Sequence, residues 1–194
     1  QEEIIFPEVP EHILSNLRPN FGNRPYQKNA FSRFLFWWDS KNKTQNRFLY
    51  HMATGSGKTL IMAGLILDLY KNPMNKGKIH NHDLHIEGGN PICGDKVVFE
   101  MKISNEIIED IKFEGNGCAI STAAESLLTE IIKGKTILQA EKITQQEMFD
   151  ALGGKVIEAR INCAILGLFT LQKGLIEFKK NPAKNKTITG NVIK

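Results

Sequence analysis

Cysteine is scarce in this chain, which has three thiols among its 194 residues. So small and odd a number does not build a disulfide framework and favours a reducing compartment, so we expect the cytoplasm.

No apolar run approaches the ~20 residues of a membrane span. The longest lies around Leu60–Leu67, and we expect no membrane association. An excess of one charge is lacking too: 25 Lys and Arg stand against 21 Asp and Glu. Composition alone therefore does not predict a nucleic-acid-binding protein.

The chain from Lys96 onward predicts strands followed by helices. "KVVFEMKI" alternates with Val97, Phe99 and Met101 on one face, and "IIEDIKFEG" follows after a turn at Asn105. Helices are then predicted over residues 119–133, 144–152 and 163–180, the second with a capping box of Thr144 and Glu147. This order predicts an α+β fold, an antiparallel sheet packed by helices. The last stretch, 181–194, is a polar tail.

The three cysteines lie at the ends of predicted elements. Cys93 sits in a glycine-containing turn before a strand, while Cys118 and Cys163 open helices. Spacings of 25 and 45 residues fit no zinc finger. At a helix N-terminus the macrodipole helps a thiol to lose its proton. Three unrelated packing cysteines remain an alternative at this point.

Asp95 adds a carboxylate beside Cys93, and Gly94 lets the turn bring both to one ion. Thiolates select iron–sulfur units or Zn²⁺, for which a carboxylate is a poorer partner than a fourth thiolate. A site with one weak ligand can exchange what it holds. The combination favours a carrier over a permanent cofactor pocket.

Four segments of residues 67–180 occur in this order: "LDLYKNPMNKGK", "NPICGDKVVFEMKI", "IIEDIKFEGNGCAISTAAESLLTEIIKGKT" and "EARINCAILGLFTLQKGL". With them, residues 67–180 resemble the U-type iron–sulfur cluster assembly scaffolds, the family of the NifU N-terminal domain, IscU and SufU. The resemblance implies that the metal and cluster ligands are Cys93, Asp95, Cys118 and Cys163, holding Zn²⁺ or a [2Fe-2S] cluster. It implies a PLP-dependent cysteine desulfurase and apo iron–sulfur acceptor proteins as partners, with Cys163 as the persulfide acceptor.

The chain departs from the pattern of that family. Asn162 stands where many members have a His before the last cysteine. A neutral amide is a weaker ligand and cannot shuttle a proton. The Leu-Pro-Pro chaperone-docking segment of the IscU branch is replaced by "KVIEA", although Arg160 keeps the basic position.

The stretch "HNHDLH" contains His80, His82 and His85. Histidine is a common metal ligand, so a metal cluster is one hypothesis. The alternative is a solvated loop, and the absence of a predicted element on either side favours that loop.

An unrelated signal precedes the scaffold-like region. "MATGSGKT" approximates a phosphate loop between an apolar strand and a helix, where Gly55 and Gly57 would cradle phosphate, Lys58 would neutralise it and Thr59 would hold Mg²⁺. Residues 21–69 resemble the start of a helicase-type ATPase of the type III restriction group. That resemblance implies Gln27 as the adenine contact and ATP as the ligand.

The later motifs that hydrolysis requires do not follow, and a single-stranded parallel sheet cannot bury itself. We therefore expect a composite: a truncated helicase-like P-loop segment, a partial α/β unit, over 1–66, and a scaffold domain over 67–180. The predicted function is a non-enzymatic iron–sulfur cluster assembly scaffold. The alternatives are a fragment of a DNA-dependent ATPase, which would bind nucleic acid, and a zinc-stabilised structural domain.

Overall fold

The computed structural model describes residues 8, 11, 32, 58–91, 93–152, 160–180 and 186–191. The chain divides into two compact units, Gln1–Asp68 and Leu69–Lys194. The elements are α3 (Lys58–Lys71), β1 (Leu84–Asn90), β2 (Asp95–Ser104), β3 (Ile107–Asn116), α4 (Ala119–Ile132), α5 (Ile137–Glu141), α6 (Gln145–Ala151), α7 (Ile161–Lys180) and β4 (Lys186–Asn191).

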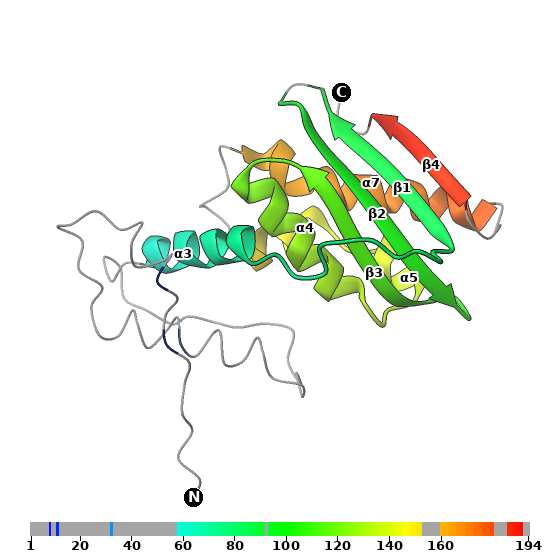
Figure 1. The fold of residues 1–194 in the computed structure, drawn as a ribbon, viewed down its shortest axis with the longest axis horizontal. Coiled ribbons are helices and arrows are strands. Elements are labelled where there is room, and N and C mark those ends of the chain that lie inside the picture. The colour runs from blue at the N-terminus through cyan, green and yellow to red at the C-terminus, as the bar shows by residue number, and fades with distance from the viewer. Residues whose placement is uncertain are drawn as a thin grey trace, which may run out of the picture. The chain divides into compact units, whose positions relative to one another are not determined.

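The strands form one four-stranded sheet in the order β3-β2-β1-β4, which Figure 1 shows face on. Strands β1, β2 and β3 are antiparallel neighbours, and β4 lies parallel to β1. The predicted turn at Asn105 is confirmed. Asn105 and Glu106 have φ of 50° and 63°, as the two central residues of a tight hairpin turn require.

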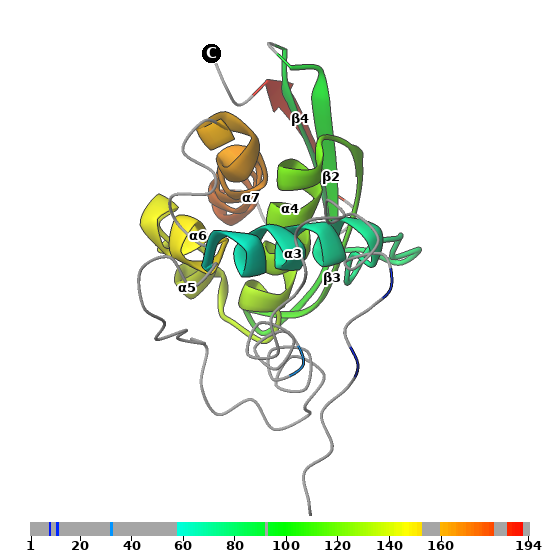
Figure 2. The ribbon, with the colours of Figure 1, turned by 90° about the vertical axis from the view of Figure 1, so that its left-hand side faces the viewer.

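Helices α4 and α7 cover one face of this sheet (Figures 1 and 2). The predicted inner face of β2 is confirmed, because Val97, Phe99 and Met101 are fully buried. Gly174 lets α7 approach β1 closely, since a Cβ at Gly174 would come 2.1 Å from Ile86 Cδ1. The predicted α+β class, with a sheet packed by helices, is therefore confirmed.

The predicted helices are also present. Helix α4 ends at Ile132 with Lys133 as its C-cap, and Gly134 follows in a left-handed conformation with φ of 80°. The capping box of Thr144 and Glu147 begins α6. Helix α5, with its own capping box of Thr136 and Gln139, was not predicted, because five residues are too few to show a helical period.

Two stretches differ from the prediction. The stretch 80–85 is a loop only as far as residue 83, because β1 begins at Leu84. Leu84 and Ile86 are buried on one side of this strand, whose histidine and glycines interrupt the apolar alternation. Residues 186–191, expected in a polar tail, pair with the edge of β1. An exposed edge offers unpaired N–H and C=O groups, and β-branched Thr187, Ile188 and Thr189 suit a strand.

Among the described residues, only α7 is long and apolar enough to cross a membrane. Most of this helix is buried inside the protein, where it packs on α4 and the sheet. It is accordingly the central core helix of the fold.

Candidate metal centre

The turn between β1 and β2 presents Cys93 and Asp95. Gly94 has φ of +77°, a left-handed conformation that favours glycine, and its N–H donates to the Asn90 carbonyl at 2.9 Å. Asn90 pairs with Asp95 where the two strands meet. Cys93 is exposed, whereas Asp95 is 7% exposed and faces the helices as the first residue of β2. The turn thus offers one accessible thiol and one buried carboxyl.

Cys118 is the N-cap of α4, directly after β3. Its Sγ accepts a hydrogen bond from the Ser121 N–H at 3.5 Å, and its carbonyl accepts one from the Thr122 N–H at 3.0 Å. A sulfur in the N-cap position faces the unpaired N–H groups of the first turn. The helix-start position predicted for Cys118 is confirmed.

Cys163 is the third residue of α7 and only 5% exposed. Burial raises the pKa of its thiol, and the neighbouring Cys118, Asp95 and Cys93 raise it further. The expectation that the helix dipole would ease its deprotonation is therefore wrong for the metal-free protein. Desolvation and nearby acidic groups outweigh the macrodipole.

The tertiary structure brings these segments together. One ligand atom each from Cys93, Asp95 and Cys163 lies within 4.8 Å of the other two. Cys118 is not part of this group of three, although it is close enough to Cys163 to raise the pKa of that thiol. Thiolates about 2.3 Å from a tetrahedral Zn²⁺ are separated by roughly 3.8 Å. Small side-chain rotations would therefore let the group close on one ion.

The buried Oδ2 of Asp95 has no hydrogen-bond partner among the residues that the structure describes. A buried polar atom without a partner costs about 1–3 kcal/mol. A cation beside Asp95 would satisfy this oxygen and favour the charged form of the Cys163 thiol. The residues present thus fit a bound divalent metal or a cluster.

Glu125 is a residue near this centre that the sequence did not single out. It lies on α4, is 3% exposed and accepts a hydrogen bond from the Ser121 hydroxyl at 3.0 Å. Burial raises its pKa to about 8, and the charge of Asp95 contributes to the rise. A sequence signal existed: Glu125 follows Cys118 by seven residues, two helical turns, on the face expected to be buried.

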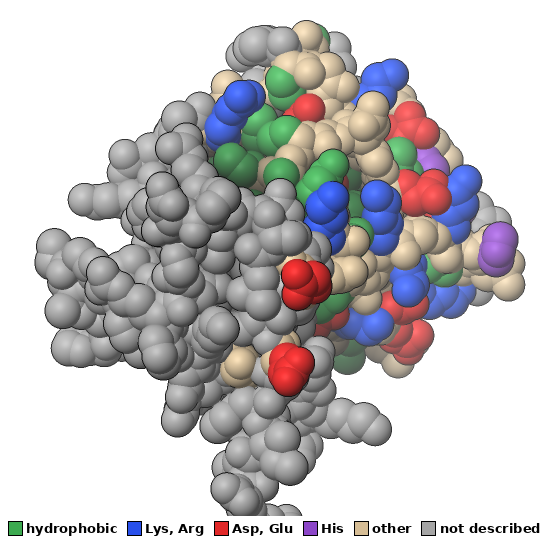
Figure 3. Space-filling view, turned by 60° about the vertical axis from the view of Figure 1, so that its left-hand side comes forward, with side chains coloured by type: hydrophobic (Ala, Val, Ile, Leu, Met, Phe, Trp, Pro, Cys, Tyr) green, Lys and Arg blue, Asp and Glu red, His purple; other side chains and the backbone are tan. Residues whose placement is uncertain are grey.

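Other predicted site residues lie outside the cluster. Asn162 and Arg160 are exposed. Gln27, Gly55 and Gly57 lie outside the described residues, and so do the side chains of Lys58 and Thr59 at the start of α3. On the face in Figure 3, basic and acidic side chains are interspersed, without the segregated basic field typical of nucleic-acid binding.

Comparison with known proteins gives two family matches. Residues 62–185 match the NifU-like N terminal domain. Residues 20–84 match the res subunit of type III restriction enzymes, about a third of the chain and overlapping the first match. P-loop and ATP binding gain no support beyond that partial match.

Two curated relatives align with the same region. The chain is 40% identical to iron-sulfur cluster assembly scaffold protein IscU 1 of Archaeoglobus fulgidus, over 60% of this chain and 76% of the relative. It is 41% identical to the zinc-dependent sulfurtransferase SufU of Bacillus subtilis, over 57% of this chain and 86% of the relative.

A solved structure supports the fold. The N-terminal NifU-like protein of Brucella abortus superposes with a TM-score of 0.51 at 17% identity, covering 60% of this chain and 93% of that one. At this identity the likeness concerns the fold alone.

Proposed function

The chain belongs to the family of the NifU-like N terminal domain, and from this premise we propose that it is an iron–sulfur cluster assembly scaffold. The observation that carries the proposal is the convergence of Cys93, Asp95 and Cys163. Cys118 is close enough to raise the pKa of the Cys163 thiol. These residues come from segments up to 70 positions apart in sequence. In such a scaffold the cluster is cargo, which the protein holds and then passes on.

We propose Cys93, Asp95, Cys118 and Cys163 as the ligands of Zn²⁺ or of a nascent [2Fe-2S] cluster. The unpartnered Oδ2 of Asp95 supports a cation at this point. A bound cation would supply the positive charge that keeps the buried thiols ionised. Asn162 is exposed and is not proposed as a ligand.

Asp95 is the proposed weak ligand that lets a cluster leave. Its replacement, Asp95→Ala, should slow the release of a reconstituted cluster to a chelator or an apo-protein. Release is measured by the decay of the cluster's visible absorption. Faster release from Asp95→Ala would rule out this role.

The proposed sulfur step is an exchange between a donor persulfide and a scaffold thiolate. The thiolate attacks the outer sulfur of the donor, a new S–S bond forms, and the donor leaves as a thiolate. Cys163 is the proposed acceptor, but its burial and raised pKa mean that it requires a cation nearby to ionise. Cys93, which is exposed, is the rival acceptor.

Peptide mass spectrometry after incubation with a cysteine desulfurase and cysteine distinguishes the two thiols. If Cys163 is the acceptor, the additional sulfur lies on Cys163 in the zinc-loaded protein and not on Cys93. Sulfur on Cys93 in the zinc-loaded protein would assign the role to Cys93.

The partners proposed for this function are a PLP-dependent cysteine desulfurase, as sulfur donor, and apo iron–sulfur proteins, as acceptors, in the cytoplasm. We also propose the division into a P-loop-like segment over 1–66, a scaffold domain over 67–180 and a tail over 181–194. The structural boundary between Asp68 and Leu69 supports a division near that point. The ATPase alternative is not favoured, because the match to the type III restriction subunit covers only residues 20–84.

Elemental analysis of the purified chain, beside its three single Cys→Ser variants, tests the proposal. We expect zinc or iron in the wild type and its loss from each variant. Supplying desulfurase, iron and cysteine should then build a cluster on the wild type alone. Tight zinc that does not exchange, with no cluster formed, would instead identify a zinc-stabilised structural domain.

A further inference from the structure

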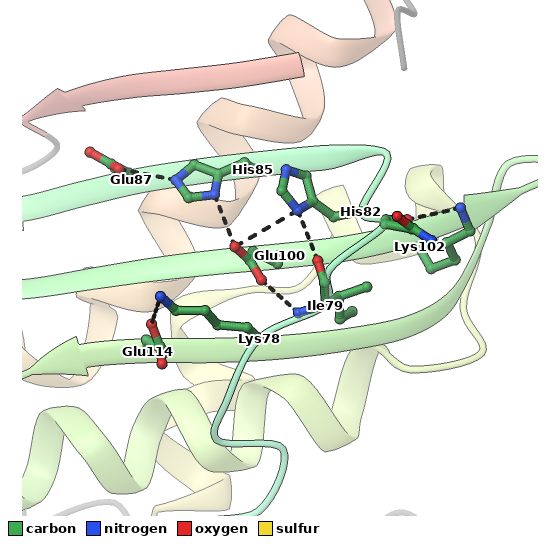
Figure 4. A network of polar contacts seen from close by, with 9 residues as sticks. Lys78, Ile79, His82, His85, Glu87, Glu100, Lys102 and Glu114 are labelled. Carbon is green, nitrogen blue, oxygen red and sulfur yellow. Dashed lines mark hydrogen bonds and ion pairs between the residues drawn. The ribbon is translucent and has the colours of Figure 1, made fainter. Parts of the chain in front are cut away.

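A second group of metal-binding side chains lies on the other face of the sheet. His85 of β1 and Glu100 of β2 are directly opposite each other in the antiparallel register, and His82 precedes β1 (Figure 4). Asp95 and Glu100 point to opposite faces of β2 and are five residues apart, or about 16 Å along the strand. This histidine cluster, His82, His85 and Glu100, is therefore distinct from the cysteine centre.

The spacing within the histidine cluster suits a metal ion. One ligand atom from each of the three residues lies within 4.8 Å of the other two. His85 Nδ1 is 3.3 Å from Glu100 Oε1, and His82 Nδ1 is 3.8 Å from the same oxygen. Nitrogen and oxygen ligands at about 2.0–2.1 Å from a tetrahedral Zn²⁺ are themselves about 3.3–3.4 Å apart.

The surroundings orient these ligands. His85 Nε2 lies 3.0 Å from Glu87 Oε1, so an Nε2–H that donates to Glu87 leaves the Nδ1 lone pair directed at Glu100. Metal-binding histidines commonly donate their second ring N–H to a carboxylate in this way. The Ile79 N–H donates to Glu100 Oε2 at 2.6 Å and leaves Oε1 toward the histidines (Figure 4).

No lysine among the described residues lies within ion-pair distance of Glu100, which is 8% exposed. Lys102 pairs with Asp83, and Lys78 pairs with Glu114. A neutral imidazole has one N–H and one lone pair, so His85 as a neutral ring can donate to only one of its two carboxylates. A cation between His85 and Glu100 would use the lone pair and the carboxylate together.

We propose that His82, His85 and Glu100 form a second metal site for a divalent transition ion such as Zn²⁺. Two imidazoles and one carboxylate suit borderline divalent ions, and three protein ligands leave a coordination position for water. The site binds more weakly than the cysteine centre, because the ion displaces hydrogen bonds that the cluster already makes, including the one between His82 Nδ1 and the Ile79 carbonyl at 2.9 Å.

The test uses the full chain in which all three cysteines are replaced by serine, so that only the histidine cluster remains. Titration with Zn²⁺ should give one equivalent bound, and Co²⁺ should give visible ligand-field bands without a sulfur charge-transfer band. Adding His85→Gln should lower the affinity at least about 10-fold. His80→Gln, at an exposed histidine two residues before His82, is the matched control and should change nothing.

The same site has a readout that does not depend on the triple variant. Native mass spectrometry of the wild type should show two zinc ions and of His85→Gln one. Glu87→Ala should weaken the second ion about 10-fold, while Glu109→Ala, at an exposed glutamate of β3, should not. A single zinc in the wild type, or equal titrations of the His85→Gln and His80→Gln variants, would overturn the proposal. Failure of the cysteine centre alone would leave the second ion in place.

Discussion

Strand β2 contributes Asp95 to the cysteine centre on one face of the sheet and Glu100 to the histidine cluster on the other face. The two sites differ in how many hydrogen-bond partners their polar atoms have. At the cysteine centre Asp95 Oδ2 has no partner, and burial raises the pKa of Cys163. In the histidine cluster both ring nitrogens of His85 and both carboxylate oxygens of Glu100 lie within hydrogen-bonding distance of a polar atom, although a neutral His85 donates to only one carboxylate. The first arrangement leaves a buried oxygen without a polar neighbour among the described residues, whereas in the second every ligand atom already has a polar neighbour that a metal ion would displace.

Because of this difference, metal binding should affect folding stability differently at the two sites. A ligand at the cysteine centre relieves the cost of a buried unpaired atom, so metal binding and folding stability are strongly linked there. A ligand at the histidine cluster replaces interactions of similar kind, so its net effect on stability is small. Four measurements test this contrast.

The largest effect is expected for Cys118→Ser at the cysteine centre. We expect this variant to lose the high-affinity zinc phase, a loss of about 100-fold or more in affinity, because a ligand matters more than the outer-shell residues that cost 10–100-fold. Serine is a good N-cap, so α4 should remain intact. Calorimetric titration measures the loss, with His80→Gln as control. Undiminished zinc affinity would remove Cys118 from the centre.

The next effect concerns pH and Glu125, whose pKa is about 8 in the folded protein against an ordinary value of 4.5. The folded state holds this proton where the unfolded state has lost it. Its contribution to stability is therefore complete below pH 4.5 and declines as the pH rises to about 8. The metal-free wild type should lose on the order of a few kcal/mol across this range relative to Glu125→Gln.

Urea unfolding in the presence of a chelator, at several pH values, measures that decline. Asp95 and Lys76 are the charged groups that act on Glu125 and are common to both proteins. Zinc at the cysteine centre should flatten the curve, because a cation nearby favours the ionised carboxyl. Parallel pH profiles of wild type and Glu125→Gln without metal would contradict the assignment.

A smaller effect is expected for Asp95→Ala in the metal-free protein. The Asp95 carboxyl is buried, one of its oxygens lacks a partner among the described residues, and its charge repels the neighbouring acidic groups. Its removal should therefore raise the free energy of unfolding by about 1 kcal/mol. The same change should reduce the stabilisation that zinc provides. Chemical denaturation with and without zinc measures both, and Asp150→Ala at an exposed site is the control. A clear loss of metal-free stability would mean that Asp95 is satisfied without a ligand.

The smallest effect is expected for His85→Gln without metal. Half-buried ion pairs and hydrogen bonds of this kind contribute less than about 1 kcal/mol. The free energy of unfolding should therefore change by less than that amount, although binding of the second zinc is lost. A destabilisation of several kcal/mol would show that the histidine cluster supports the fold itself.

Much of the fold could be predicted from local patterns. The alternation of Val97, Phe99 and Met101 predicted β2 correctly, and the capping box of Thr144 and Glu147 predicted the start of α6. Strand β1 was missed because its two glycines, one of which makes room for Thr170 of α7, conceal its period. That requirement comes from a helix 82 residues later, so no local pattern carries it.

The sequence by itself determined the types and order of the elements and the donors that a metal could use, because periodicity, caps and residue chemistry are local. Only the tertiary structure decided the environment of each donor. It buried Cys163, left Asp95 Oδ2 without a partner and placed His85 against Glu100. Burial and proximity depend on contacts between distant segments, and they control ionisation and the cost of an unpaired atom.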